Sequence, residues 1–209
     1  MMSLREQQKS ERRHRILDTA ERLIRETGGT DFSMRRLVAE AHVSFATPFN
    51  LFGSKEGLLY ALLARSLDKI TLKGLAFESD DPSLHVIEAA ENAVQSFLDD
   101  PVFLRPLYQV LLSVSHPVHR PLFMQRTLSY WQTAASTIPC PPKSSDPVLQ
   151  DAAANALMAH FIGLLELWVH RDIDDAAFRK RAIFGVKLCV QVVRNPARAI
   201  ELMDRVKSD

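Results

Sequence analysis

The sequence predicts an all-α protein, and two observations support this class. Apolar residues make up 46% of the 209 residues; they recur at helical spacing, and no run alternates between apolar and polar residues with a sustained period of two. The chain has only seven glycines, which is few for a β-sandwich or a Rossmann-type protein. A chain of this length has room for one domain with a large core or for two small domains.

The first helix is expected at about residues 10–27. One stripe of its surface is apolar, as in an amphipathic helix that packs on a core, and Gly28-Gly29 ends it. The stripe consists of Ile16, Leu17, Ala20, Leu23, Ile24 and Thr27.

Two short helices joined by a tight turn are expected next. Ser33 can cap the first of them, which runs to about Ala41, and His42-Val43 forms the turn. The second short helix ends near Phe52-Gly53.

The cap of this second short helix follows from its proline. Ser44 or Thr47 is expected at the N-cap, since Pro48 would fit best at a first helical position.

Six longer helices are expected in the rest of the chain, most of them introduced by serine, aspartate or proline. Their approximate ranges are 55–73 after Ser54, 82–98 after Asp81, 101–113 after Asp100, 121–138, 147–171 after Asp146, and a last one that Asp172 or Asp174 caps and that ends near Arg194. Residues 139–145 are expected to form a stiff connector, and Asn195-Pro196 can cap a short tenth helix.

Charge is distributed unevenly along the chain, whose formal net charge is only +1. Residues 1–15 hold five basic and two acidic side chains, whereas residues 61–209 hold 16 basic and 17 acidic ones. A basic arm on a near-neutral body suits a protein that touches phosphate at one end only. A solubilising tail is the alternative.

Several features favour a reduced, cytoplasmic setting without a membrane span. Cys140 and Cys189 are isolated, and neither lies in a CxxC pair. The N-terminus begins with polar and charged residues, unlike a secretory signal. The most apolar stretch, residues 152–169, is interrupted by an asparagine, a histidine and a glutamate, so we expect a buried helix there.

Three pieces of sequence follow one another in a specific order. They are an amphipathic first helix that ends at Gly28-Gly29, the run LVAEAHVS at residues 37–44, and the run TPFNLFGSKE at residues 47–56. With these pieces, residues 10–60 resemble the N-terminal domain of the TetR family of bacterial transcription repressors. The motifs cover about a quarter of the chain. The resemblance implies a helix-turn-helix DNA-binding domain over residues 1–54 and a helical ligand-binding and dimerisation domain over residues 55–209.

Two positions depart from the family's pattern. His42 stands where the family usually has glycine and would need a positive φ, which histidine tolerates better than most residues. Phe49 stands where the family commonly has a tyrosine that reaches phosphate, and a phenylalanine cannot donate that hydrogen bond.

The expected DNA contacts also follow from side-chain chemistry, because a helix in the major groove places its first residues near base edges. Phe45 and Ala46 can meet thymine methyl groups. Asn50 can pair with an adenine edge, and Thr47 offers a hydroxyl to base or phosphate. The expected set is Arg12, Arg13, Ser33, Arg35, Ser44, Phe45, Ala46, Thr47, Phe49, Asn50 and Lys55, with His14 as a further phosphate candidate.

Lys55 resembles the family's phosphate-binding lysine. The second short helix has no basic residue of its own, so affinity would depend on Lys55, Arg35 and the N-terminal arm. In the alternative interpretation, Phe49, Leu51 and Phe52 are core residues of an ordinary helical bundle.

Large apolar side chains are frequent in the later helices, where TetR-like proteins surround a pocket for a small inducer. Plain core packing is the alternative. The pocket candidates are Phe97, Met124, Trp131, Phe161 and Trp168, with His85, Tyr108 and Asn155 as polar anchors. Such a composition suits an apolar or aromatic ligand.

The expected helix over residues 147–171 is apolar nearly all round and must bury two faces. The next helix carries a second apolar stripe, so we expect a four-helix interface formed by these two helices from each of two subunits. A central core helix of a monomer is the alternative. A symmetric dimer would present two DNA-binding domains to a palindromic operator, roughly 34–36 Å apart.

Catalytic and metal-binding motifs are not found in the sequence. His116 and His119 have no cysteine or carboxylate nearby at ligand spacing, and GxSxG, HExxH and glycine-rich phosphate loops do not occur. We therefore expect no metal, no cofactor and no enzyme, but a ligand-responsive repressor that binds double-stranded DNA as a homodimer. A small helical-bundle enzyme and a partner-binding adaptor are the alternatives, and activation in place of repression stays open.

Overall fold

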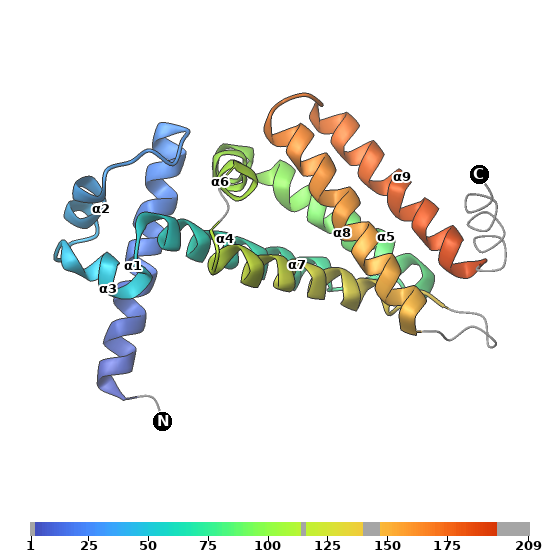
Figure 1. The fold of residues 1–209 in the computed structure, drawn as a ribbon, viewed down its shortest axis with the longest axis horizontal. Coiled ribbons are helices and arrows are strands. Elements are labelled where there is room, and N and C mark those ends of the chain that lie inside the picture. The colour runs from blue at the N-terminus through green and yellow to red at the C-terminus, as the bar shows by residue number, and fades with distance from the viewer. Residues whose placement is uncertain (1–2, 114–115, 140–146, 196–209) are drawn as a thin grey trace. The chain divides into compact units, whose positions relative to one another are not determined.

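The computed structural model describes residues 3–113, 116–139 and 147–195 (Figure 1). Over these residues the chain is all-α, as predicted, with nine helices and no strand. The helices are α1 Leu4–Thr27, α2 Met34–Glu40, α3 Ala46–Phe52, α4 Lys55–Gly74, α5 Pro82–Asp99, α6 Pro101–Ser113, α7 His119–Ala135, α8 Pro147–Val169 and α9 Asp175–Arg194.

The chain divides into two compact units. One unit comprises residues 1–68 and 100–123, and the other comprises residues 69–99 and 124–209. We call helices α1 to α3 of the first unit the head, and the second unit the body. This division by packing differs from the expected functional division at residue 54, which stays a prediction.

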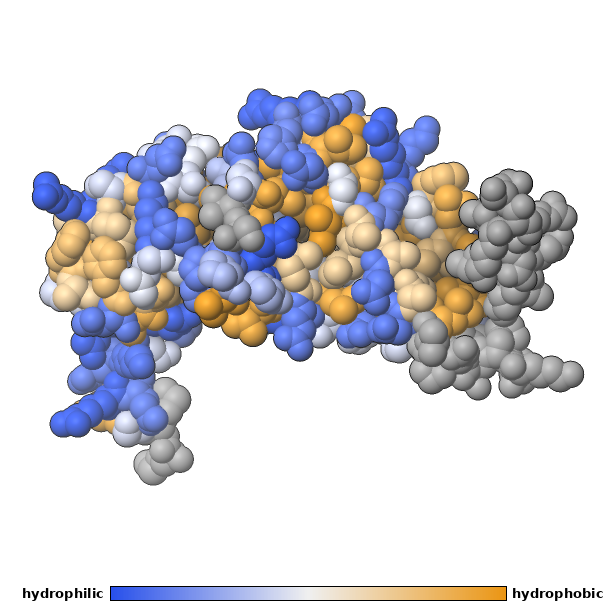
Figure 2. All heavy atoms as spheres, in the orientation of Figure 1, coloured by the Kyte–Doolittle hydropathy of each residue, from blue (hydrophilic) through white to orange (hydrophobic). Residues whose placement is uncertain are grey.

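Helix α1 begins earlier than predicted, at Leu4 instead of about Ser10. Ser3 forms a capping box, in which its hydroxyl accepts from the Glu6 N–H at 3.3 Å and its own N–H donates to the Glu6 carboxylate at 2.8 Å. These bonds lower the pKa of Glu6. The predicted basic arm is therefore mostly a helical extension of α1, and hydrophilic side chains cover it (Figure 2).

The other end of α1 matches the prediction. Gly28 has a φ of 68° and its N–H donates to the Ile24 carbonyl at 2.8 Å, which ends the helix. The predicted apolar stripe is buried from Ile16 to Ile24 and packs against α2 and α3. Thr27 is exposed, and its hydroxyl donates to the Leu23 carbonyl.

Two further predicted helix starts, those of α3 and α7, are wrong. Helix α3 has Phe45 at its N-cap, no side chain caps it, and Pro48 is its third residue. Ser44 bonds to the Thr47 hydroxyl at 2.8 Å instead of capping the helix. Helix α7 begins at His119, before the predicted Pro121, because His116 Nδ1 accepts the N–H of His119 at 3.2 Å. It also ends at Ala135, before the predicted Ile138.

Two predicted helix caps are confirmed. The Ser54 hydroxyl accepts the Gly57 N–H at 3.1 Å at the start of α4, and the Asp174 carboxylate accepts the Ala177 N–H at 2.7 Å at the start of α9. Helix α8 ends two residues before the predicted Arg171, which adopts a φ of 66°. The predicted cap at Asp146, most of the connector and the tenth helix lie outside the described residues.

The body is held together by helices α5, α8 and α9. Helices α8 and α9 lie side by side, and α5 packs against α9 (Figure 1). Leu149–Val169 of α8 is long and apolar enough to cross a membrane by length and composition alone, with 44% of its most apolar window buried. The core helix of a soluble protein passes the same test, so this feature is weak evidence for a span.

Candidate nucleic-acid interface

The predicted helix-turn-helix is formed by α2 and α3 of the head. The Ser33 hydroxyl caps α2 by accepting the Arg36 N–H at 3.1 Å. The tight turn after α2 is closed by the Val43 N–H, which donates to the Val38 carbonyl at 3.1 Å. His42 has a φ of 53° in this turn, as predicted from its place in the motif.

Helix α3 has one inner and one outer face. Pro48 and Phe52 are buried, whereas Phe45, Phe49 and Asn50 are exposed. Ala46 is exposed beside them, and Thr47 is half-buried. Of the three residues that the alternative places in the core, only Phe52 is buried, whereas Leu51 is half-buried and Phe49 is exposed. On the face drawn in Figure 2, hydrophobic side chains gather over α2 and α3.

The candidate phosphate contacts of α1 have local partners. Arg12 and His14 each bond to a carbonyl one turn earlier in α1. The Arg13 guanidinium lies 4.6 Å from the centre of the Phe52 ring, and its Nη1 donates to the Leu51 carbonyl at 3.5 Å. Arg13 therefore packs beside the carboxyl end of α3 while its side chain stays exposed.

Lys55 and Arg35 differ in their surroundings. Lys55 is half-buried at the start of α4, and its Nζ lies 4.8 Å from the centre of the Phe32 ring, a contact between a cation and an aromatic face. Arg35 is exposed on α2.

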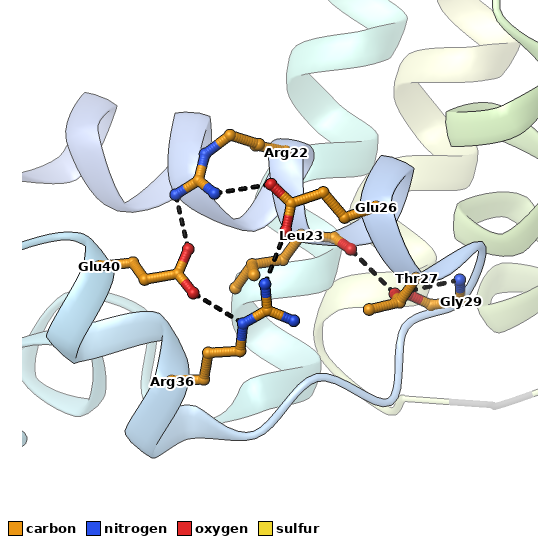
Figure 3. A network of polar contacts seen from close by, with 7 residues as sticks. All are labelled: Arg22, Leu23, Glu26, Thr27, Gly29, Arg36 and Glu40. Carbon is orange, nitrogen blue, oxygen red and sulfur yellow. Dashed lines mark hydrogen bonds and ion pairs between the residues drawn. The ribbon is translucent and has the colours of Figure 1, made fainter.

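Four charged side chains tie α2 to α1 in a closed ring, which we call the ion-pair ring (Figure 3). Arg22 contacts Glu26 at 2.8 Å and Glu40 at 2.7 Å, and Arg36 contacts the same two carboxylates at 2.6 Å each. Arg36 and Arg22 lower the pKa of Glu40. Sequence analysis missed this ring: the spacing of Arg22–Glu26 and Arg36–Glu40 signals pairs within each helix, but the pairs between helices depend on the fold.

A second set of charges links α1 to α4 and α6 within the first unit. Arg25 contacts Glu21 at 2.8 Å and Asp100 at 2.5 Å, and its guanidinium lies 4.7 Å from the centre of the Phe103 ring. Arg65 of α4 also contacts Glu21. The head is therefore bound to the start of α6 and to the middle of α4.

A glycine permits the close corner between α3 and α4. A Cβ atom at Gly57 would lie 2.0 Å from the Phe52 carbonyl oxygen and 3.3 Å from His119 Nε2. His119 stacks on Tyr60 with ring centroids 5.5 Å apart, and His116 lies 4.4 Å from His119. Burial and the neighbouring His116 lower the pKa of His119.

The pocket candidates of the body are brought together only in part. Phe97 lies 6.0 Å from both Phe161 and Trp168 between ring centroids, and Trp131 lies 5.3 Å from Phe161. All four are buried. Phe178, which was not among the candidates, lies within the same cluster at 5.7 Å from Phe161.

The other pocket candidates have different surroundings. Met124 is half-buried on α7. Tyr108 belongs to the first unit, where its hydroxyl is 3.4 Å from that of Ser66 and burial raises its pKa to about 12. Asn155 is exposed and donates to the Asp151 carbonyl of its own helix at 2.9 Å.

His85 holds the loop between α4 and α5. Its ring stacks on Phe77 with centroids 4.2 Å apart, and its Nε2 lies 2.8 Å from the Ser79 carbonyl oxygen. Over the described residues, no three histidine, cysteine or carboxylate side chains are grouped so that they could hold a metal ion.

Helices α8 and α9 carry exposed faces of small and apolar residues. Phe184, Leu188 and Val192 are 63%, 53% and 45% exposed along one side of α9. On α8, Gly163 is exposed, and a Cβ atom there would meet nothing within 4 Å. Ala152, Ala156 and Ala159 are exposed on the same helix.

Comparisons with known proteins agree with the geometry of the head. Residues 16–62 match the model of the bacterial regulatory proteins of the tetR family. This match spans helices α1 to α3 from the start of the apolar stripe, together with the first turns of α4. No curated protein has a sequence that matches this chain.

Solved structures of similar fold come from several bacteria. A TetR transcriptional regulator from Rhodococcus sp. RHA1 has a TM-score of 0.70 and 16% identity, covering 87% of this chain and 96% of that one. A TetR-family regulator from Syntrophomonas wolfei has a TM-score of 0.67 and 22% identity, with the same coverage. SmeT, the repressor of the Stenotrophomonas maltophilia multidrug efflux pump SmeDEF, has a TM-score of 0.61 and 18% identity, covering 86% of this chain and 89% of SmeT.

These likenesses extend over most of the chain in fold and over the head in sequence. The helix-turn-helix domain of this chain is therefore a TetR-family domain, and the chain has the fold of TetR-family transcriptional regulators.

Proposed function

We propose that this chain is a cytoplasmic, ligand-responsive transcriptional repressor that binds a palindromic operator as a homodimer. The observation that carries the proposal is the outer face of α3, which exposes Phe45, Ala46, Phe49 and Asn50 in the helix that follows the turn. In helix-turn-helix proteins this second helix enters the major groove. The repressor named in one structural neighbour supports repression as the direction of control.

Phosphate contacts would come from basic residues around α3. Arg35 on α2 and Arg12 on α1 are exposed, Arg13 lies beside the end of α3, and Lys55 begins α4. Ser33 at the start of α2, and Ser44 and Thr47 at the start of α3, add hydroxyl groups. The basic residues carry the positive charge that α3 lacks. The affinity for DNA would therefore depend on salt, whereas the preference for particular bases would depend on α3.

Dimerisation would use α8 and α9. The exposed stripe of Phe184, Leu188 and Val192 on α9 is apolar enough to need a partner, and the small residues of α8 allow another backbone to approach closely. A second copy of the same surface would complete a four-helix interface of the kind that symmetric dimers use.

Release would follow the binding of a small apolar or aromatic molecule in the body, among the aromatic side chains of α5, α7 and α8. Helix α4 begins beside the head and ends in the body, so a shift of α4 would respace the two heads of a dimer. The contacts of Arg65 on α4 with Asp18 and Glu21 on α1 would carry that shift to α1. A coupling of about 1–3 kcal/mol is typical of such switches.

Selection from a random pool of duplexes at low ionic strength tests the proposal. We expect the purified protein to enrich a palindromic sequence, bound by two subunits, with an affinity that falls steeply as salt rises. Failure to enrich any duplex would contradict DNA binding and favour an adaptor. Enrichment of a sequence without two-fold symmetry would contradict the dimeric arrangement only.

A further inference from the structure

The outer face of α3 is unusual for a surface that contacts nucleic acid, because it carries no charge and one polar side chain. It consists of Phe45, Ala46, Phe49 and Asn50. Asn50 is thus the one group on this face that can form a strong hydrogen bond with a base edge. Thr47 is half-buried and shares its hydroxyl with Ser44.

The two phenylalanines form a pair. Phe45 is 53% exposed and Phe49 is 38% exposed, and their ring centroids lie 5.4 Å apart with a tilt of 48°. This geometry is that of an ordinary aromatic contact, so each ring restrains the other. The chain has eleven phenylalanines, and over the described residues only Phe45, Phe49 and Phe184 are exposed. Phe184 belongs to the apolar stripe of α9, which leaves this pair as a separate apolar surface.

The chemistry of a phenyl ring restricts what the pair can recognise. A phenyl ring has no conventional hydrogen-bond donor or acceptor, and the apolar group that bases present in the major groove is the C5-methyl group of thymine. Burying a ring against that methyl group removes apolar surface of both partners from water. Contact with the phosphate backbone would give neither ring such a gain.

We propose that Phe45 and Phe49 together recognise C5-methyl groups of pyrimidines, so that the operator is selected by its methyl groups as well as by hydrogen bonds. This inference rests on the proposed function, because it assigns the base chemistry that α3 recognises. Two consequences follow. At the contacted positions, replacement of thymine by uracil should weaken binding, and 5-methylcytosine should be bound more tightly than cytosine.

The test uses the full-length protein and the duplex enriched from the random pool. Each thymine is replaced in turn by uracil, which removes only the methyl group. At the contacted positions we expect a loss of about fourfold in affinity for each methyl group that becomes buried, and little change elsewhere. In a second series, cytosine and 5-methylcytosine are compared at the same positions, with the methylated base bound about fourfold more tightly.

Variants assign the effect to the two rings. In Phe45→Ala and Phe49→Ala the preference for thymine over uracil should shrink at one position each, while in Asn50→Ala it should persist with a relaxed preference at an adenine. Thermal unfolding checks that each variant folds. Because both rings are exposed, we expect the melting temperature to be nearly unchanged.

Three outcomes would overturn the proposal in distinguishable ways. If a duplex is bound but uracil and thymine are equivalent throughout, methyl recognition is wrong and DNA binding stands. If the uracil penalty is as large in both phenylalanine variants as in the unaltered protein, the methyl group is recognised by other residues. If no duplex is enriched at all, the inference and the proposed function fail together.

Discussion

Phenylalanines at α3 and in the aromatic cluster of the body have opposite surroundings. Phe45 and Phe49 project from α3 into solvent, whereas Phe178 on α9 is fully buried, with Phe97 and Phe161 6.4 Å and 5.7 Å away between ring centroids. The same residue type thus forms an outer face on one helix and a core between others. An exposed large apolar side chain is the informative observation, so α3 displays a candidate binding surface directly, whereas the buried aromatic cluster of α5, α8 and α9 does not.

The first prediction tests this contrast through stability. Phe178→Ala should lower the free energy of unfolding by about 3–5 kcal/mol, since it leaves a cavity in a packed aromatic cluster. Phe45→Ala should change it by no more than about 0.5 kcal/mol, because the ring is mostly in water. Urea unfolding of both variants measures the difference. A small effect of Phe178→Ala would indicate that the cluster already tolerates empty space, as a ligand pocket would.

The second prediction concerns the other exposed apolar surface, on α8 and α9. Gly163→Trp should leave each subunit folded, because a Cβ atom there meets nothing within 4 Å, but should block close approach of a second copy. Light scattering should then detect monomers, and operator affinity should fall about a hundredfold or more through the loss of bivalent binding.

Leu72→Trp is the matched control for Gly163→Trp. Leu72 is 80% exposed on α4, so a bulky side chain there adds the same apolar group outside the proposed interface. If the protein stays dimeric with Gly163→Trp but becomes monomeric with Leu72→Trp, the dimer interface lies on α4 and not on α8.

Features that depend on local interactions could be predicted from the sequence, whereas features that depend on non-local contacts could not. The end of α1 at Gly28, the cap at Ser54 and the positive φ of His42 depend on neighbouring residues, and each was predicted. The early start of α1 was also within reach, since Ser3 and Glu6 form a recognisable capping-box pattern. The error there came from treating a run of charged residues as an arm.

Non-local contacts explain what sequence analysis missed. The spacing of Phe97, Trp131 and Trp168 predicts apolar faces, but periodicity does not distinguish rings that line a cavity from rings that fill a core. Tyr108 and Asn155 were grouped with them by composition, and the fold places Tyr108 in the other unit and leaves Asn155 exposed. For the head, the motif predicted Phe45 and Asn50 as base-contacting residues; both are exposed in the fold, and their contact with bases stays a prediction.

The third prediction addresses charge around α3. Lys55→Ala should reduce affinity for all duplexes alike and lower the salt dependence of binding by about one unit of slope. It removes a cation that lies 4.8 Å from the Phe32 ring and would reach a phosphate. Titrations over a series of salt concentrations measure the slope, with the exposed Lys73→Ala as control in the body. If the salt dependence of binding is the same for Lys55→Ala and the unaltered protein, Lys55 does not contact phosphate and its role is structural.

The smallest effect is expected from the ion-pair ring, and it separates two adjacent arginines. Arg36 contacts Glu26 and Glu40, whereas Arg35 is exposed beside it. Arg36→Ala should lower the melting temperature slightly at low salt and not at 1 M salt, where exposed charges are screened. Arg35→Ala should leave the melting temperature unchanged but weaken duplex binding.

The pH dependence of the same variant gives an independent check. The pKa of Glu40 is lowered in the folded protein by Arg36 and Arg22, so the contribution of the ring is present above the ordinary glutamate pKa and is lost as the pH falls through the folded value. The difference in melting temperature between Arg36→Ala and the unaltered protein should therefore be greatest near neutral pH and vanish in acid. A difference that persists in acid would mean that Arg36 stabilises the head by packing its side chain and not through its carboxylate partners.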